Sequence, residues 1–586
     1  MIRKKLRINR ETVLLLAVLT ASLGMRILPV ASDLPYFSSL DEATYVETAL
    51  RFGTGTFKLS SYLHGALYPQ VLFLEYAAYF VLGRMLGLFS SSTDFLLAYI
   101  KDPTSFFLLA RVTAVLCGVG VVWLSHAIAS RVYHPRVGLV ASLFTGFSLL
   151  MFQMSFLALA DMPAVFLLLM ATYLAVRSVE QPKERRFYCA AAALVGLAAA
   201  CKYHAGFGVV TLTVAAFMKC ADHEHRTRAF VHLAVLGSVF VVVGFCVGMP
   251  QFLLDPAAFY GDVFHRLSGA YIGNNPDRNA WLFLFTHHLR NGLGIPLELA
   301  SLLGLGFALY NRSKWDLLML SFPFFFYLLF MRSLGFAYHL LPAVAFLLIL
   351  AARFVDAVVE KLRGRGSLGA SLFLAAVVAT PTFLDSVRLM QVMRSPSTKT
   401  MAKTWIEGHI PGGATIMAEG YVFAVPTSGP PLVETRSTLE RDIAFIIENK
   451  GTGRTATLRL AHYDDLYDNA RAYDILKVPF LDSEAITRDR PPYLIMTSDK
   501  DRSAGKELAG LLMMTGDYGE KREAVKEGIR RRYDVLATIA PTVAFTAFFP
   551  HLMDEDYRLI RNWPLFSRGR SRGPTITIWE RRSRHG

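Results

Sequence analysis

Long apolar runs, separated by short clusters of basic residues, fill roughly the first two thirds of the chain. The first run, Thr12 to Val30, follows a basic stretch, is long, and has no clear small-residue cleavage site of the kind that ends a signal peptide. Later runs contain roughly 15 to 25 apolar residues, the length that a helix needs to cross a bilayer. The pattern therefore predicts a bundle of membrane-spanning helices, the first of them uncleaved.

The basic clusters between the runs are typical of cytoplasmic loops. If all of them are cytoplasmic, the runs alternate consistently only when Tyr68 to Leu88 does not cross the membrane. Gln70, Glu75 and Arg84 inside that segment favour an interfacial or re-entrant helix. The sequence then predicts about eleven spans, with the N-terminus inside and the C-terminus outside. The predicted spans are 13–30, 105–130, 137–156, 162–177, 187–201, 204–219, 229–249, 281–310, 315–331, 338–353 and 367–384.

The overall composition agrees with a membrane protein. In 586 residues, 53% are hydrophobic and 18% are charged, with a mean hydropathy of +0.37, which excludes an ordinary soluble enzyme of this length. The net charge of +15 comes from clusters between apolar runs, so we expect no nucleic-acid partner. The five cysteines lie in or beside apolar runs without a CxxC pair, which indicates neither a zinc knuckle nor a disulfide framework.

The composition changes at about residue 395, where polar, turn-rich sequence begins. Strands are expected at 415–425, 492–498 and 574–580, and a helix at 502–517, so residues 395–586 are predicted to be a soluble extracytoplasmic α/β domain. Residues 1–394 form the polytopic membrane domain, with a long first outer loop at 31–104.

Under this topology, polar residues reach the outer face at four places. Asp41 and Glu42 lie in the first outer loop, Asp161 follows the third span, Lys202 follows the fifth, and His339 joins the ninth to the tenth. A charge at a membrane boundary is costly to bury and is usually found where a cavity or a substrate needs it. One outward cleft could hold all of these side chains.

Each of these residues also has a purely structural interpretation. Ser39 and Glu42 have capping-box spacing, and Asp41 suits the positive end of a helix dipole. Asp161, before a proline, could be an N-cap, and Lys202 could extend to the lipid headgroups. His339 alone is more typical of a packed histidine.

Five segments, in order, resemble the GT-C class of integral-membrane glycosyltransferases, in the branch of the protein O-mannosyltransferases and the aminoarabinose transferases. "LDEATYVETALRF" resembles their Asp-Glu-x-x-Tyr segment and includes Tyr45. "YLHGALYPQVLFLEYAAYFVLG" resembles the Tyr-x-[Lys/His]-Pro-Pro-Leu stretch and its juxtamembrane helix, with His64 kept and Gly65-Ala66 in place of the proline pair. "FLALADMPAVF", "GLAAACKYHAGF" and "AYHLLPAVAF" resemble the Asp-x-Pro, Gly-to-Lys and Tyr-x-Leu-Pro segments.

The resemblance implies a GT-C-like fold in the plasma (inner) membrane and a sugar donor linked to a polyprenyl phosphate in the membrane lipid. The acceptor would be a protein, a lipid or a glycan. No cofactor is required, although a divalent metal on Glu42 and His265 is possible. The absence of a Walker A sequence or a convincing dinucleotide fingerprint agrees with a donor that is not a nucleotide.

Transfer to a hydroxyl needs a base on the acceptor and positive charge at the departing phosphate. Asp41 is the candidate base, and the family implies inversion at the anomeric carbon. Lys202 is the candidate for the phosphate, with His339 and Arg266 as further phosphate contacts. Acceptor-binding or orienting roles are expected for the remaining candidates: Glu42, Tyr45, His64 and Asp161.

Three other functions compete with this interpretation. A transporter or flippase of a lipid-linked sugar would show inverted repeats with broken helices, which the sequence does not show. A non-catalytic scaffold would not depend on Asp41. An oligosaccharyltransferase-like transfer to asparagine lacks a WWD-like motif in residues 395–586.

Overall fold

The computed structural model describes most of the chain, which divides into two compact units. One unit comprises Met1–Val30, Thr44–Tyr76 and Leu109–Met390, and the other comprises Ala31–Ala43, Ala77–Leu108 and Gln391–Gly586. The described residues are 10–36, 40–55, 57–59, 61–267, 280–330, 337–364, 366–419, 421–422, 425–426, 430–450, 454–468, 470–478, 481, 483–497, 518–540, 543–544, 560–562 and 571–582.

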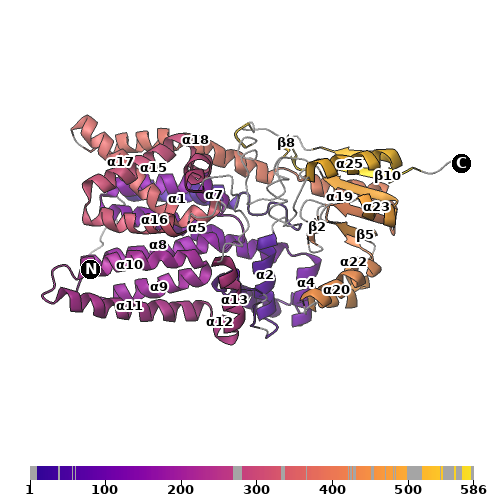
Figure 1. Cartoon of the computed structure of the whole chain (residues 1–586), viewed down its shortest axis with the longest axis horizontal. Helices are drawn as coiled ribbons and strands as arrows, with labels where there is room; N and C mark the ends of the chain where they lie inside the picture. Colours follow the sequence, from indigo (N-terminus) through magenta and orange to yellow (C-terminus); the bar gives the residue numbers. More distant parts are fainter. Residues whose placement is uncertain are drawn as a thin grey trace. The chain divides into compact units, whose positions relative to one another are not determined.

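The first unit is helical, and α8, α9, α10 and α11 run alongside one another in it (Figure 1). Helices α2, α3, α5 and α18 continue from one unit into the other. The helices are α1 (Arg10–Ile27), α2 (Leu40–Phe52), α3 (Leu67–Met85), α5 (Thr104–Val132), α6 (Pro135–Phe147), α7 (Leu149–Gln153), α8 (Asp161–Glu180), α9 (Arg185–Cys201), α10 (Gly208–Lys219), α11 (Arg226–Gly248), α12 (Gln251–Leu254), α13 (Pro256–Leu267), α14 (Ala280–Phe283), α15 (Arg290–Asn311), α16 (Lys314–Phe330), α17 (Leu341–Arg363) and α18 (Leu368–Arg394), with short 3₁₀ or π segments η1 (Tyr203–Phe207), η2 (Leu284–Leu289) and η3 (Ala337–Leu340).

The helices of this unit match the predicted membrane segments. Each predicted span coincides with helical residues, which confirms the helical membrane region. Six described segments are long and apolar enough to cross a membrane: 104–132, 161–180, 226–248, 284–311, 337–363 and 368–394. The chain is therefore a multi-pass membrane protein, whereas the count of eleven spans stays a prediction. The segment predicted to lie along the interface forms α3, and its place in the bilayer stays a prediction.

Helix α17 shows how the sequence sets the helix ends and the core. It begins with Pro342 in its first turn, where a missing N–H removes no helical bond. It ends at Gly364, whose φ of 68° is the left-handed conformation that terminates helices. Its first half, Leu341 to Ala352, is buried on all sides, so an all-apolar sequence is required there.

Buried ion pairs join the helices at the ends that carry basic clusters. Arg353 of α17 pairs with the fully buried Asp316 of α16, which also accepts a 3.0 Å hydrogen bond from the hydroxyl of Tyr133. Arg136 of α6 approaches Asp356 of α17 at 3.3 Å. A buried carboxylate is tolerated only with such partners, so these pairs fix which helices are neighbours.

The second unit contains a six-stranded mixed sheet in the order β4-β5-β1-β6-β10-β7. Neighbouring strands are parallel from β4 to β6, and β10 is antiparallel to both β6 and β7. The strands are β1 (Thr415–Glu419), β2 (Tyr421–Val422), β3 (Val425–Pro426), β4 (Val433–Glu434), β5 (Ala472–Val478), β6 (Tyr493–Thr497), β7 (Tyr533–Ile539), β8 (Val543–Ala544), β9 (Arg572–Gly573) and β10 (Ile576–Arg581), and the helices are α4 (Ser92–Lys101), α19 (Thr398–His409), α20 (Arg436–Lys450), α21 (Arg454–Ala461), α22 (Tyr463–Tyr467), α23 (Ser483–Asp489) and α25 (Tyr518–Arg532).

Helices cover both faces of this sheet. Ile416 and Ala418 of β1 pack with Ile406 of α19 on one face. Met417, between them in sequence, packs with Ile486 of α23 and Ile529 of α25 on the other. Because successive side chains of a strand point to opposite faces, this alternation buries the strand on both sides. The predicted α/β region is confirmed.

The predicted strands fall on described strands. The expected strand segment at 415–425 contains β1 and β2 and ends at the first residue of β3. The segment at 492–498 contains β6, and that at 574–580 contains all of β10 except its last residue, Arg581. The helix expected at 502–517 lies outside the described residues. Strand β5 was not predicted. It begins within polar sequence that is typical of turns, and its apolar residues follow this polar run.

Candidate active site

Lys202 lies at the junction of two helical segments. It is the C-cap of α9 and has an extended backbone, with its N–H donating to the carbonyl of Ala198 at 2.8 Å. Its side chain is 17% exposed. The Sγ of Cys201, the preceding residue, lies 3.5 Å from the carbonyl oxygen of Ala160, which holds this end of α9 against the start of α8.

The ammonium of Lys202 forms an ion pair with Asp161, the first residue of α8, whose side chain is 5% exposed. The N-cap of α8 is Ala160, so the N-cap interpretation of Asp161 is wrong. Lys202 is directed at this carboxylate, which replaces the alternative of an extended side chain among lipid headgroups. Negative charge is favourable at the N-terminal end of a helix, and the carboxylate can orient the lysine.

Aromatic side chains from η3 complete the surroundings of Lys202. Its Nζ lies 4.7 Å from the ring centroid of Tyr338, a cation–π geometry. The rings of Tyr338 and His339 are 4.4 Å apart, and His339 is 6.0 Å from His204. The structure therefore joins Asp161 to Lys202 and places Tyr338 between Lys202 and His339, whereas one cleft that holds all of these side chains stays a prediction.

A large apolar cavity adjoins this cluster. Its volume is about 800 Å³, and aliphatic and aromatic side chains of α10, α15, α16 and α17 line it. Leu340, next to His339, is part of the lining. Phe326, another lining residue, has its ring 5.8 Å from His204. Asp161, Lys202, Tyr338 and His339 are not themselves lining residues, so this cavity of hydrocarbon character meets the cluster through Leu340 and Phe326.

The loop that carries His64 rests on the residues beside Lys202. The hydroxyl of Tyr203 donates to the carbonyl of Tyr62 at 2.6 Å. Asp262 of α13 accepts from the backbone N–H of Tyr62 at 2.5 Å and from the hydroxyl of Ser61 at 3.0 Å. His64 is therefore held on a loop that is fixed from both α13 and the end of α9.

Gly65 explains why this loop lacks the proline pair of the resembled motif. A Cβ at this position would clash with the carbonyl oxygens of Ala200 and Cys201, at the end of α9. The neighbouring Ala66 is fully buried with Tyr62 and Ala200. Close approach of two backbones selects glycine, so the loop packs where a larger residue would push it away from Lys202.

The acidic motif starts α2. Asp41 is partly exposed in the first turn, and Glu42 is 1% exposed. Ser39, the proposed capping partner, lies outside the described residues. One turn later, Tyr45 meets His64, with 3.3 Å between its hydroxyl and Nδ1. Asp41 and Glu42 belong to the second unit, and the other site candidates that the structure describes belong to the first: Tyr45, His64, Asp161, Lys202 and His339.

Two further candidates fall outside what the structure describes. Arg266 and His265 belong to α13, but their side chains are not among the described ones. Among the described residues, no group of three or more His, Cys, Asp or Glu side chains could hold a metal ion.

A family model matches the part of the chain that contains Asp161 and Lys202. Residues 105–247, which include Asp161 and Lys202, match the model of the family described as dolichyl-phosphate-mannose-protein mannosyltransferase. The chain is a membrane glycosyltransferase of the GT-C class. The class and the enzymatic activity predicted from the five motifs are thereby confirmed. A search of curated proteins finds no match to this glycosyltransferase.

Solved structures of the same class overlap with this glycosyltransferase at low identity. An oligosaccharyltransferase from Archaeoglobus fulgidus is 11% identical, with a TM-score of 0.46 over 92% of this chain and 73% of that chain. ArnT from Cupriavidus metallidurans in the apo state is 13% identical, with a TM-score of 0.49 over 83% and 93%. ArnT from the same organism bound to undecaprenyl phosphate is 14% identical, with a TM-score of 0.48 over 84% of this chain and 93% of that chain.

The sequence did not single out three residues of this site. Tyr338, Tyr203 and Asp262 touch the cluster or its supporting loop. Tyr338 directly precedes His339 and Tyr203 directly follows Lys202, so adjacency to a candidate was the available signal. Asp262 gave none, because its partners Ser61 and Tyr62 lie about two hundred positions away.

Proposed function

We propose that this glycosyltransferase moves a single sugar from a polyprenyl-phosphate donor to an acceptor at the outer face of the plasma (inner) membrane, with inversion. In this proposal the N-terminus is cytoplasmic and residues 395–586 are extracytoplasmic. The observation that carries it is the Lys202 cluster at the border of an apolar cavity. A phosphate on a long hydrocarbon tail has this same division between charge and apolar chain.

Lys202 has the chemistry of a leaving-group contact. An ammonium has three donors, and Asp161 orients it from one side while the face of Tyr338 covers another. A fixed cation stabilises negative charge as it develops on the departing phosphate. His339 would donate a second hydrogen bond to the phosphate, and Arg266 a third.

The cavity suits the hydrocarbon tail of the donor. Burying apolar surface stabilises binding by roughly 25 cal/mol per Å², so even a few isoprene units would contribute several kcal/mol. Leu340 and Phe326 connect the cavity to His339 and His204, which would put the tail beside the phosphate site. The family described by the matching model uses a dolichyl phosphate donor, which supports the same donor class.

Asp41 is the proposed base on the acceptor hydroxyl. A positioned carboxylate contributes on the order of 10²–10⁴ to such a transfer. Glu42, Tyr45 and His64 would orient the acceptor, which is a protein, lipid or glycan hydroxyl. Attack from the face opposite the phosphate inverts the anomeric centre.

The test is sugar transfer by the purified chain from a panel of polyprenyl-phosphate sugars, with Asp41→Asn and with Val344→Trp, which fills the cavity. We expect Asp41→Asn to lose most of the transfer rate at unchanged donor binding. Val344→Trp should weaken binding of polyprenyl phosphate and leave binding of a short, water-soluble sugar phosphate unchanged. Normal transfer by Asp41→Asn would contradict the proposed base, and equal losses for both ligands in Val344→Trp would contradict the tail site.

A further inference from the structure

The first outer loop is tied to the C-terminal region within the second unit. Asp33, just after α1, forms a 2.7 Å ion pair with Arg572 of β9. Their side chains are 5% and 7% exposed, and about 540 positions separate them in sequence. A buried ion pair is strongly destabilised when one partner is removed, because the other charge is left without compensation.

Arg572 holds more than Asp33. The same Nη2 donates to the carbonyl of Met393 at 3.3 Å, and the backbone N–H of Arg572 donates to Pro396 at 2.9 Å. Thr398, at the start of α19, donates to the carbonyl of Pro574 at 2.8 Å. The segment 571–574 therefore fastens the outer loop to the residues that lead from α18 into α19.

The backbone of Asp33 is itself constrained. Its φ of 62° lies in the left-handed region, which costs a non-glycine residue of the order of 1 kcal/mol and persists only when the surroundings hold it. Aspartate and asparagine tolerate this conformation better than other residues. The ion pair to Arg572 supplies such a restraint.

A second contact holds the loop three residues later. Lys403 of α19 lies 5.8 Å from the ring centroid of Tyr36 and pairs with Glu407 one turn further along the helix. Burial raises the pKa of Tyr36, and the carboxylates of Glu407 and Asp102 raise it further. Asp102 is the C-cap residue of α4, so the charge at the end of α4 acts on the same ring as Glu407 of α19.

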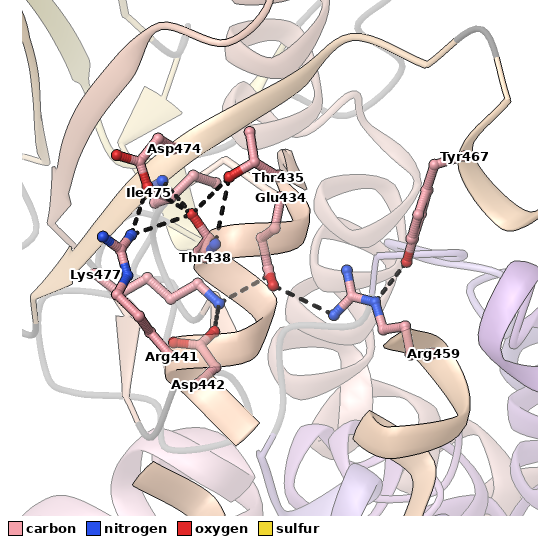
Figure 2. A network of polar contacts seen from close by, with 10 residues as sticks. All are labelled: Glu434, Thr435, Thr438, Arg441, Asp442, Arg459, Tyr467, Asp474, Ile475 and Lys477. Atoms are coloured by element: carbon pink, nitrogen blue, oxygen red, sulfur yellow. Dashed lines mark hydrogen bonds and ion pairs between the residues drawn. The ribbon is translucent and has the colours of Figure 1, made fainter. Parts of the chain in front are cut away.

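The remaining part of the loop packs against a helix that a charged network joins to the sheet edge. Helix α4 packs against α21. Figure 2 shows that Arg459 of α21 reaches Glu434 of β4 at 3.5 Å and the hydroxyl of Tyr467 at 2.5 Å. Glu434 in turn pairs with Lys477 of β5 at 2.8 Å. The surface that receives α4 is therefore fixed to two strands of the sheet.

We propose that the C-terminal region is a positioning platform for the acidic motif, and that Asp33 and Arg572 are positioning residues for Asp41. Asp41 lies eight residues after Asp33 and five after Tyr36, in the same unit. Two restraints so close to the first turn of α2 limit where its carboxylate can point. Catalysis by a positioned base falls steeply when the base moves by about 1 Å. This inference rests on the proposed role of Asp41.

The test compares Asp33→Asn and Arg572→Gln with the native full-length chain. Asparagine keeps the tolerance for a left-handed backbone, so Asp33→Asn isolates the loss of charge. We expect kcat to fall on the order of 10²-fold with KM for the donor unchanged, since misplacement of the base affects the chemical step. Arg572→Lys, which keeps the charge, should restore part of kcat.

The matched control is Arg582→Gln, in the same region. Arg582 forms an exposed ion pair with Asp534 of β7, which is not part of the outer loop. We expect its kcat to equal that of the native chain. A fall equal to that of Arg572→Gln would mean that arginine loss acts through general destabilisation and would overturn the inference.

Amide hydrogen exchange of residues 41–46 gives a readout that does not depend on activity. We expect faster exchange there in Arg572→Gln and in Lys403→Met, with β1 and β6 unchanged as evidence that the sheet is folded. Faster exchange in these two variants, together with normal transfer by Asp41→Asn, would contradict the role of Asp41 as base but support the platform. Unchanged exchange in both variants would overturn the platform, whatever Asp41 does.

Discussion

Two lysines, one in each unit, meet carboxylates in different ways. Lys477 of β5 is 7% exposed and is shared between Glu434 and Asp442. Lys202 is 17% exposed, and among the described residues it pairs with one carboxylate, Asp161, and lies against the ring of Tyr338. The charge of Lys477 is balanced by two carboxylates. Lys202 has one carboxylate partner and keeps further N–H donors beside a cavity.

The two arrangements suit different roles for Lys477 and Lys202. Around Lys477, strand β4, strand β5 and helix α20 contribute one member each, so the ion pairs join three elements (Figure 2). Around Lys202, an aromatic face replaces the second anion. An aromatic face attracts a cation without neutralising its charge, so the lysine can still attract a phosphate.

The largest expected effect is on catalysis by Lys202. In Lys202→Met the transfer rate should fall by about 10²–10³, because the developing charge on the leaving phosphate loses a fixed cation. Initial rates of sugar transfer by the purified chain at saturating donor measure this. The matched control is Lys219→Met in the same unit, whose ammonium binds the carbonyls of Ser178 and Glu184 at 3.1 and 3.2 Å. Equal losses in the two variants would remove the distinction.

The second effect is on the stability of the second unit. In Lys477→Met, Asp442 loses its cation and, of its described cation partners, Glu434 keeps only Arg459 at 3.5 Å, which should cost up to about 3–5 kcal/mol of unfolding free energy. Hydrogen exchange of the β5 and β1 amides in the full-length chain measures it. Combining Lys477→Met with Asp442→Asn should recover part of the loss, since Asp442 is then no longer a charge without its cation. A double variant less stable than the single one would contradict this reasoning.

Hydrophobic pattern was sufficient to predict the membrane helices, because each of them carries its own signal, whereas the class was predicted from the resemblance of five motifs. The ends of α8 and α9 lie within three residues of the ends of the predicted spans 162–177 and 187–201. Sequence order also placed Asp161 and Lys202 at the same side of the bundle. It could not give their direct pairing, since the contact depends on how α8 packs against α9.

Contacts between distant segments are what the sequence could not supply. Asp33 and Arg572 each sit in polar sequence that resembles an ordinary loop, and only the fold joins them. Strand β4 has two residues, too few for a periodic pattern, yet its Glu434 organises the network at the sheet edge. The alternation of hydrophobic residues predicts that a sheet exists, and not which strand lies beside which.

The third effect is a pH dependence at Asp442. Burial raises the pKa of this carboxyl, and Lys477 lowers it only in part. Because the folded pKa lies above the unfolded one, the stabilisation from the neutral form is present at low pH and is lost as pH rises through the folded pKa. Relative to the native chain, Asp442→Asn should therefore gain stability as pH rises from below 3.8 through the raised value. Exchange of the β5 amides across this range checks it, and a difference of opposite slope would show that the ion pair dominates burial.

The smallest effect is expected at an exposed pair between α20 and α22. Arg436 and Asp464 are 2.9 Å apart, but their side chains are 49% and 85% exposed. Water and salt screen such a pair, so Asp464→Asn should change the unfolding free energy by only about 0–1 kcal/mol. The same exchange measurement on β5 compares it directly with Lys477→Met. A loss as large as that of Lys477→Met would mean that pairing alone, and not burial, sets the energy of these contacts.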